Sequence, residues 1–154
     1  MTDLVILVGS VYGGSVEVAE AVAEAVEAAG FSVEVNEAPS ITHLDGNSVI
    51  LLVSSTTGNG ELPDNIQPFY AELQKQPPAI SGRGYAVIAL GDSSYSDTYC
   101  AGGLLLDEAF ANLGANALMP LLKIDALEFF QPADGISDWL AGWLNALKKF
   151  TRKG

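Results

Sequence analysis

Apolar and polar stretches alternate along the whole chain in a pattern that predicts strands and helices in turn. Unbroken apolar runs at 4–8, 49–53 and 85–90 are typical of central strands in a parallel sheet, because helices cover both faces of such strands. The segment 31–35 alternates apolar and polar residues, and 117–124 contains a proline, which cannot donate to a central ladder. We therefore expect the three apolar runs in the middle of the sheet and the other two segments at its edges.

Four other segments show the spacing of amphipathic helices, with apolar residues every three or four positions. They lie at about residues 14–29, 67–74, 103–113 and 136–150. Trp139 and Trp143 share one face of the last segment, which places them in the expected core. The alternation predicts an α/β fold, a doubly wound five-stranded parallel sheet of order 2-1-3-4-5 with helices on both faces. Such a sheet binds ligands at its carboxyl edge, between strands one and three.

The composition fits one globular domain, which we expect to span residues 1–154. Hydrophobic residues make up 49% of the chain and charged residues 17%, a balance that provides a core. The single cysteine, Cys100, excludes an internal disulfide and is compatible with a reducing compartment. No cationic region precedes the first apolar run, and no apolar stretch approaches the roughly 20 residues that span a bilayer. We therefore expect a cytoplasmic protein without membrane association.

Acidity is the strongest feature of the composition. The chain has 7 Lys and Arg against 19 Asp and Glu, a formal net charge of −12. Four of the cations stand together near the end of the chain: Lys148, Lys149, Arg152 and Lys153. The rest of the surface is therefore more acidic still. We expect no nucleic acid or anionic membrane as a partner, because phosphate contacts need clustered Lys and Arg. The charge favours a basic protein as partner.

Three loops follow the central strands and should converge at one edge of the sheet. The first is Ser10, Val11, Tyr12, Gly13, Gly14 and Ser15. Its hydroxyls and its glycine turn, at the start of a helix, are typical of an anion site. The loop lacks a Gly-Lys-Ser/Thr ending and the Gly-x-Gly-x-x-Gly spacing, which argues against nucleoside triphosphates and dinucleotides and leaves a monophosphate.

The second loop, 54–65, has the sequence SSTTGNGELPDN, and the third, 91–100, has GDSSYSDTYC. Together the three loops resemble the phosphate loop and the two isoalloxazine loops of the flavodoxin family, which includes the FMN domains of diflavin reductases. The resemblance extends along nearly the whole chain. Since no insertion of about twenty residues interrupts the last strand, the chain is similar to short-chain flavodoxins, notably the MioC-like branch.

The resemblance implies FMN as cofactor and assigns residues of all three loops to it. They are Ser10, Val11, Tyr12, Gly13, Gly14 and Ser15 around the phosphate; Ser55, Thr56, Thr57, Gly58, Asn59 and Gly60 beside the flavin ring; and Gly91, Asp92, Ser93, Tyr95, Tyr99 and Cys100 in the third loop. Tyr95 corresponds to the tyrosine that stacks on the outer face of the ring. Gly58 and Asn59 stand where family members turn a peptide toward flavin N5 on reduction. No metal ligand or catalytic residue is expected.

Three features depart from the family pattern. Tyr12 occupies a phosphate-loop position that is usually threonine, and Thr57 stands where many relatives have an aromatic ring. The segment from Tyr95 to Cys100 is one residue longer than the commonest family spacing. The resemblance implies an electron carrier that shuttles single low-potential electrons between a flavodoxin reductase and acceptor proteins. We expect these partners to dock their basic surfaces on an acidic rim of Glu61, Asp64, Asp92 and Asp97, and the carrier to be a monomer.

Two alternatives use the same strand order or the same cofactor. A receiver domain needs an acidic pair after strand one and an aspartate after strand three, where this chain has Gly9-Ser10 and Ser54-Ser55. An FMN-dependent quinone or flavin oxidoreductase that uses NAD(P)H directly stays open, because Thr57 leaves the inner face of the ring less covered. Direct NAD(P)H oxidation would discriminate it from a carrier.

Overall fold

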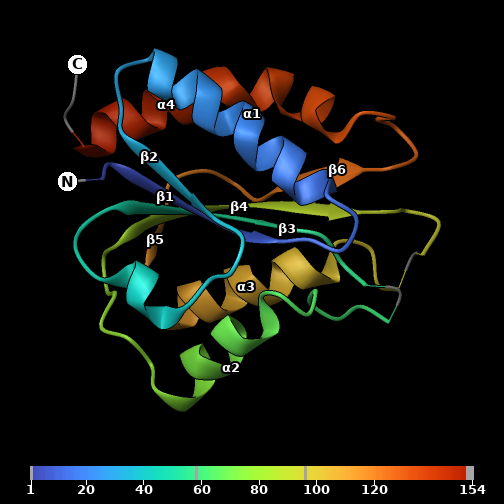
Figure 1. Cartoon of the computed structure of the whole chain (residues 1–154), viewed down its shortest axis with the longest axis horizontal. Helices are drawn as coiled ribbons and strands as arrows, with labels where there is room; N and C mark the ends of the chain where they lie inside the picture. Colours follow the sequence, from blue (N-terminus) through green and yellow to red (C-terminus); the bar gives the residue numbers. More distant parts are fainter. Residues whose placement is uncertain (1, 58, 96, 152–154) are drawn as a thin grey trace.

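The computed structural model describes residues 2–57, 59–95 and 97–151. A central sheet lies between two helical layers, with α1 and α4 on one face and α2 and α3 on the other (Figure 1). This layered arrangement is the predicted one, and it follows from strands that are apolar on both faces.

All strand pairs in the sheet are parallel. The strands are β1 Leu4–Gly9, β2 Val33–Asn36, β3 Val49–Ser54, β4 Gly84–Gly91, β5 Asn116–Ala117 and β6 Leu122–Asp125. The order β2-β1-β3-β4-β5 confirms the prediction, with β1, β3 and β4 in the middle and β6 also paired with β4. Register is continuous between β1 and β3, from Leu4 opposite Val49 to Gly9 opposite Ser54.

The last predicted strand, 117–124, is divided in the structure, so that the described sheet has six strands rather than five. On β4, Tyr85 pairs with Ala117 and Ile88 pairs with Leu122. The chain between Ala117 and Leu122 is therefore longer than the stretch of β4 it passes, and it leaves the ladder. Pro120 lies within this segment and cannot donate a backbone hydrogen bond, which explains the break.

The helices begin and end within two residues of the predicted positions. They are α1 Gly14–Ala28, α2 Gln67–Lys75, α3 Ala101–Asn112 and α4 Ser137–Thr151, with short 3-10 turns η1 Ile41–Leu44 and η2 Pro132–Ile136. His43 lies in η1 and is half-buried, and its Nδ1 accepts a hydrogen bond from the Ser40 amide, so it caps this turn. Within the described residues, no helix combines the length and the hydropathy that crossing a membrane requires.

Two hydrophobic clusters fill the spaces on either side of the sheet. Leu4, Ile6 and Val8 of β1 pack on the side of α1 and α4, whereas Val5 and Leu7 pack on the side of α2 and α3. This division follows from the alternation of side chains along a strand. The predicted position of the two tryptophans of α4 in the core is confirmed, since both are buried in the first cluster. Their rings stack with centroids 5.2 Å apart.

Candidate functional site

The loops that follow β1, β3 and β4 meet at the carboxyl edge of the sheet, at the right in Figure 1. They line two hollows of about 300 Å³ each. The first is lined by Val11, Tyr12, Gly14, Ser55, Thr56 and Thr57. The second is lined by Ser55, Thr56, Thr57, Leu90, Gly91, Asp92, Tyr95, Thr98 and Ala126. Residues 55–57 line both hollows, so the second loop lies between them and contributes to the wall of each.

The first loop makes a tight turn into α1. Gly13 has φ 88°, a conformation that glycine adopts without strain, and its amide donates to Ser10 Oγ at 2.8 Å. Its carbonyl accepts from the Glu17 amide at 3.0 Å, the first bond of the helix. The amides before Glu17 have no partner within the helix, which makes this end of α1 suited to an anion.

Ser15 lies on the first turn of α1 and is fully buried. Its Oγ has no hydrogen-bond partner among the described residues. A buried hydroxyl without a partner costs about 1–3 kcal/mol, so native structures seldom keep one without a reason. The hydroxyl stands at a helix amino terminus, the end of a helix that is suited to binding an anion.

The second loop is closed by its own hydrogen bonds. The Thr57 amide donates to the Glu61 carbonyl at 2.9 Å, and the Gly60 amide donates to the Thr57 carbonyl at 2.9 Å. Thr56 Oγ1 accepts from the Gly102 amide at 3.0 Å and lies 3.3 Å from the Leu90 carbonyl, to which it donates. The Thr56 hydroxyl therefore joins this loop to α3 and β4. Asn59 is exposed, and Gly58 lies outside the described residues.

The third loop presents Tyr95 at the second hollow with 59% of its surface exposed. One hydrogen bond within the loop and one from outside hold it in place. Asp92 Oδ1 accepts from the Ser94 amide at 2.9 Å, and Asp125 Oδ1, at the end of β6, accepts from the Ser93 amide at 3.1 Å. Hydrogen bonds from Ser93 and from the backbone after β6 hold the pKa of the Asp125 carboxyl below its ordinary value. Ser93 is thus used in positioning the loop that carries Tyr95.

Tyr99 and Cys100 do not line either hollow. Cys100 is fully buried, precedes α3 with φ 57°, and its Sγ lies 3.4 Å from the Ala89 carbonyl. Burial raises the pKa of this thiol and also raises the pKa of Tyr99 to about 12. Both groups are therefore neutral at pH 7, and the buried thiol lacks the thiolate character of a reactive cysteine. A Cβ at Gly91 would lie 2.7 Å from the Cys100 amide, so glycine permits this packing.

Three residues that line the second hollow were not predicted for the site: Leu90, Thr98 and Ala126. Thr98 stands inside the third loop, and Leu90 belongs to the strand that precedes it. Ala126 follows β6, whose carboxyl end reaches the same edge of the sheet. The expected strand order was therefore a signal that could have identified Ala126.

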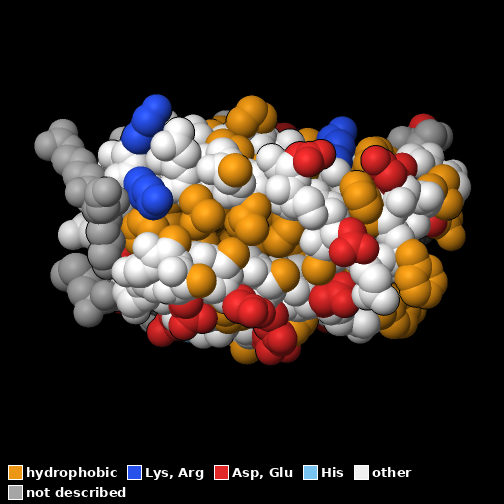
Figure 2. All heavy atoms as spheres, turned by 90° about the horizontal axis from the view of Figure 1, so that it is seen from above, with side chains coloured by type: hydrophobic (Ala, Val, Ile, Leu, Met, Phe, Trp, Pro, Cys, Tyr) orange, Lys and Arg blue, Asp and Glu red, His pale blue; other side chains and the backbone are white. Residues whose placement is uncertain are grey.

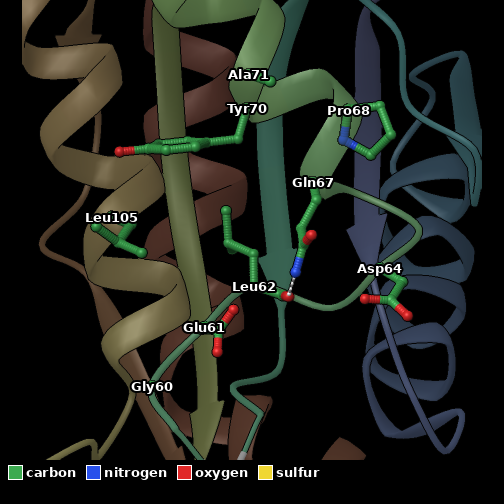
Figure 3. A pocket seen from close by; sticks show the side chains of 9 residues that line it. All are labelled: Gly60, Glu61, Leu62, Asp64, Gln67, Pro68, Tyr70, Ala71 and Leu105. Carbon is green, nitrogen blue, oxygen red and sulfur yellow. Dashed lines mark hydrogen bonds between the residues drawn. The ribbon is translucent and has the colours of Figure 1, made fainter.

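A larger hollow of about 590 Å³ lies to one side of these loops, between α2 and α3. Figure 3 shows Tyr70 and Leu105 on its two helical sides, and Glu61 and Asp64 on the loop at its lower end. Its lining is mostly apolar and includes Leu62, Pro68 and Ala71. No group of three His, Cys, Asp or Glu side chains within the described ranges could hold a metal ion.

Comparisons with known proteins give the same family for most of the chain. The flavodoxin family model matches residues 6–131. Protein MioC of Escherichia coli (strain K12) is 38% identical over 148 residues, covering 96% of this chain and 100% of the relative. Flavodoxin YqcA of Pectobacterium carotovorum is 39% identical over 145 residues, covering 93% of this chain and 95% of the relative.

Solved structures agree with these sequence relatives. A cysteine-to-serine variant of flavodoxin from Pseudomonas aeruginosa has a TM-score of 0.87 at 42% identity, covering 94% of this chain and 98% of that chain. Oxidised Flavodoxin 1 from Bacillus cereus has a TM-score of 0.80 at 24% identity, over 92% and 97% of the two chains, and supports the fold. From the family match, the relatives and the strand order together, this chain belongs to the flavodoxin family.

Proposed function

We propose that this protein holds one FMN at the three loops and passes single low-potential electrons between partner proteins. The observation that carries the proposal is Ser15, whose buried hydroxyl has no partner among the described residues and stands at the start of α1. Flavodoxins as a family bind flavin, and the two hollows beside the first and third loops offer the space. These residues fit a flavin that carries one phosphate.

The phosphate would be held by the hydroxyls of Ser10 and Ser15 and by the free amides at the start of α1. Ser10 Oγ accepts from the Gly13 amide, which leaves the hydrogen of its own hydroxyl available to donate. Tyr95 would cover the outer face of the ring, and Thr57 would border it from between the two hollows. When bound, FMN supplies the reversible acceptance of electrons.

Acidic side chains near the loops favour a low reduction potential. Glu61, Asp64, Asp92 and Asp97 form the acidic rim, whose carboxylates oppose the addition of negative charge nearby. At about 10 Å and an effective dielectric constant near 20, each carboxylate contributes about 1.5 kcal/mol before screening by salt. The rim would thereby make the reduced cofactor a stronger electron donor.

One observation keeps the second candidate function open. Thr57 is half-buried, lines both hollows and has no ring with which to cover a flavin. A face left open in this way would give a nicotinamide access, as in a quinone or flavin oxidoreductase. A holoprotein that oxidises NADPH without a reductase would favour this second function.

The first prediction is that the purified protein takes up one FMN per chain in the presence of a chelator. Hydroxyls, backbone amides and a helix terminus bind the phosphate without a cation, so EDTA should leave uptake unchanged. Visible absorption and mass analysis of the extracted cofactor measure the stoichiometry. A protein that binds no FMN, or binds it only with a divalent metal, contradicts the proposed function.

Surface charge supports a basic partner at the carboxyl edge. In Figure 2, acidic side chains follow one long edge of the face shown and reach its right-hand end, where the loops lie. The basic side chains lie mainly toward the other end, where Lys148 and Lys149 occupy the last turn of α4. We propose a flavodoxin reductase and acceptor proteins with basic surfaces as partners of a monomeric carrier. Glu61 and Asp64 also line the mostly apolar hollow of Figure 3, so a partner that docks there would contact both carboxylates and apolar side chains.

The second prediction is that electron transfer from the reduced protein to a basic c-type cytochrome slows as salt rises. Opposite charges steer the encounter, and their attraction is screened beyond roughly 8 Å at physiological ionic strength. Stopped-flow second-order rates across a salt series measure the effect. The variant Glu61→Gln/Asp64→Asn should show a weaker salt dependence.

The matched control removes two carboxylates of α1, in the variant Glu20→Gln/Glu24→Gln. Both residues are exposed and lie on the helix instead of the rim. This control should keep nearly the salt dependence of the unchanged protein. Equal effects of the two double variants would show that net charge matters and the rim does not.

A further inference from the structure

The Asn65 side chain joins three segments that lie far apart in the sequence. Its Oδ1 accepts a hydrogen bond from the Ser10 amide at 3.0 Å. Its Nδ2 donates to the Val8 carbonyl at 2.7 Å and to the Glu37 carbonyl at 2.8 Å. One orientation of the amide alone satisfies an N–H and two carbonyls at once, so the side chain is held in a single arrangement.

The backbone around Asn65 is itself held by the core. Ile66 is fully buried, and its amide donates to the Pro63 carbonyl at 3.1 Å. A Cβ at Gly9 would lie 2.7 Å from Ile66 Cγ2, so the end of β1 passes directly against this segment. The backbone that carries Asn65 is therefore fixed by core packing, and Asn65 can hold the loop that follows Gly9 in place.

A chain of hydrogen bonds leads from Asn65 to the start of α1. Asn65 holds the Ser10 amide, Ser10 Oγ accepts from the Gly13 amide, and the Gly13 carbonyl accepts from the Glu17 amide. The Ser10 amide is thus occupied by protein and is not a donor for a ligand. The bond between Asn65 and the Ser10 amide instead holds the first loop, and with it the Ser10 hydroxyl, in place.

We propose that Asn65 is a positioning residue that fixes the phosphate loop and thereby selects flavins that carry a phosphate. The inference rests on the proposed function, since it concerns how the same site holds FMN. Without Asn65, the loop loses its link to the 63–66 turn, and the donors for the phosphate are no longer arranged in advance. The proposed contacts to the ring would come from the second and third loops. Asn65 is the last residue of the second loop, and the bonds of its side chain go to Ser10, Val8 and Glu37, outside both of these loops.

The third prediction compares FMN with riboflavin, which has the same ring and no phosphate. In Asn65→Ala, the dissociation constant for FMN should rise about tenfold or more, while that for riboflavin changes by less than about threefold. Titration of the apoprotein by flavin fluorescence measures both. Titration of the apoprotein with inorganic phosphate, followed by NMR, should show weaker binding in the variant without any flavin present.

Gln67→Ala is the matched control, because Gln67 is an amide in the same segment whose Nε2 donates to the Leu62 carbonyl at 2.8 Å. It should leave the ratio of FMN to riboflavin affinity unchanged. Asn65→Asp keeps the size and the acceptor for Ser10 but removes both donors, and it should also weaken FMN selectively. An equal loss of FMN and riboflavin affinity in both Asn65 variants overturns the inference. A failure of the unchanged protein to prefer FMN would instead contradict the proposed function.

Discussion

Replacing Ser15 by alanine is expected to stabilise the apoprotein and to weaken its binding of FMN. The hydroxyl is fully buried and has no partner among the described residues, so its removal should raise the free energy of unfolding of the apoprotein by about 1 kcal/mol. A hydrogen bond to a charged group contributes about 1.5–3 kcal/mol, so the dissociation constant for FMN should rise about 10- to 100-fold. Denaturant unfolding of the apoprotein and flavin titration measure the two effects.

Ser54 is the control for this experiment, because it is equally buried and its Oγ donates to the Ser55 carbonyl at 2.9 Å. Ser54→Ala removes a satisfied hydrogen bond and should lower the free energy of unfolding by about 1 kcal/mol. The two serine variants are thus expected to change stability in opposite directions. If Ser15→Ala destabilises the apoprotein as Ser54→Ala does, or binds FMN as the unchanged protein does, Ser15 is not a phosphate ligand.

The largest loss of stability is expected for Trp143→Ala. Trp143 is fully buried between α4 and the sheet and stacks on Trp139. Truncating such a side chain leaves a cavity that the surroundings fill only in part, which costs about 3–5 kcal/mol. For a chain of this size the melting temperature should fall by about 10 °C. Thermal unfolding followed by circular dichroism measures it.

Trp143→Phe separates packing from hydrogen bonding at this position. The Nε1 atoms of Trp143 and Trp139 have no partner within the described part of the chain, so phenylalanine keeps a ring and removes a buried, unpaired N–H. Its loss of stability should be clearly smaller than that of Trp143→Ala. Equal losses of stability in the two variants would mean that the indole N–H, and not the packing of the ring, accounts for the contribution of Trp143.

The general plan of the fold follows from local properties of the sequence. Three apolar runs predicted the central strands, because a strand covered on both faces has no polar side, and the order of the sheet followed from their number and from the edge segments. The helix boundaries were predicted within two residues, since amphipathic spacing depends on neighbours three or four positions away. The three loops could be assigned to one edge because the carboxyl ends of parallel strands lie at the same edge of a sheet.

The parts of the site that could not be predicted depend on contacts between distant residues. Asn65 bonds to Ser10, Val8 and Glu37, and Asp125 bonds to Ser93, across 28 to 57 positions of sequence. No local pattern distinguishes such an asparagine or aspartate from one that faces water. The unpaired state of Ser15 is likewise invisible in the sequence, because burial and hydrogen-bond partners arise only on folding.

The sequence by itself therefore determined the α/β architecture, the order of the strands and the loops that form the carboxyl edge. Tertiary structure decided where the last strand divides, because the division depends on which residues of β4 pair with β5 before Pro120 and with β6 after it. It also decided which hydroxyls are free to bind a ligand and which hold the loops together. The physical reason is that periodicity records which side of an element is buried, whereas hydrogen bonding depends on which groups folding brings within reach.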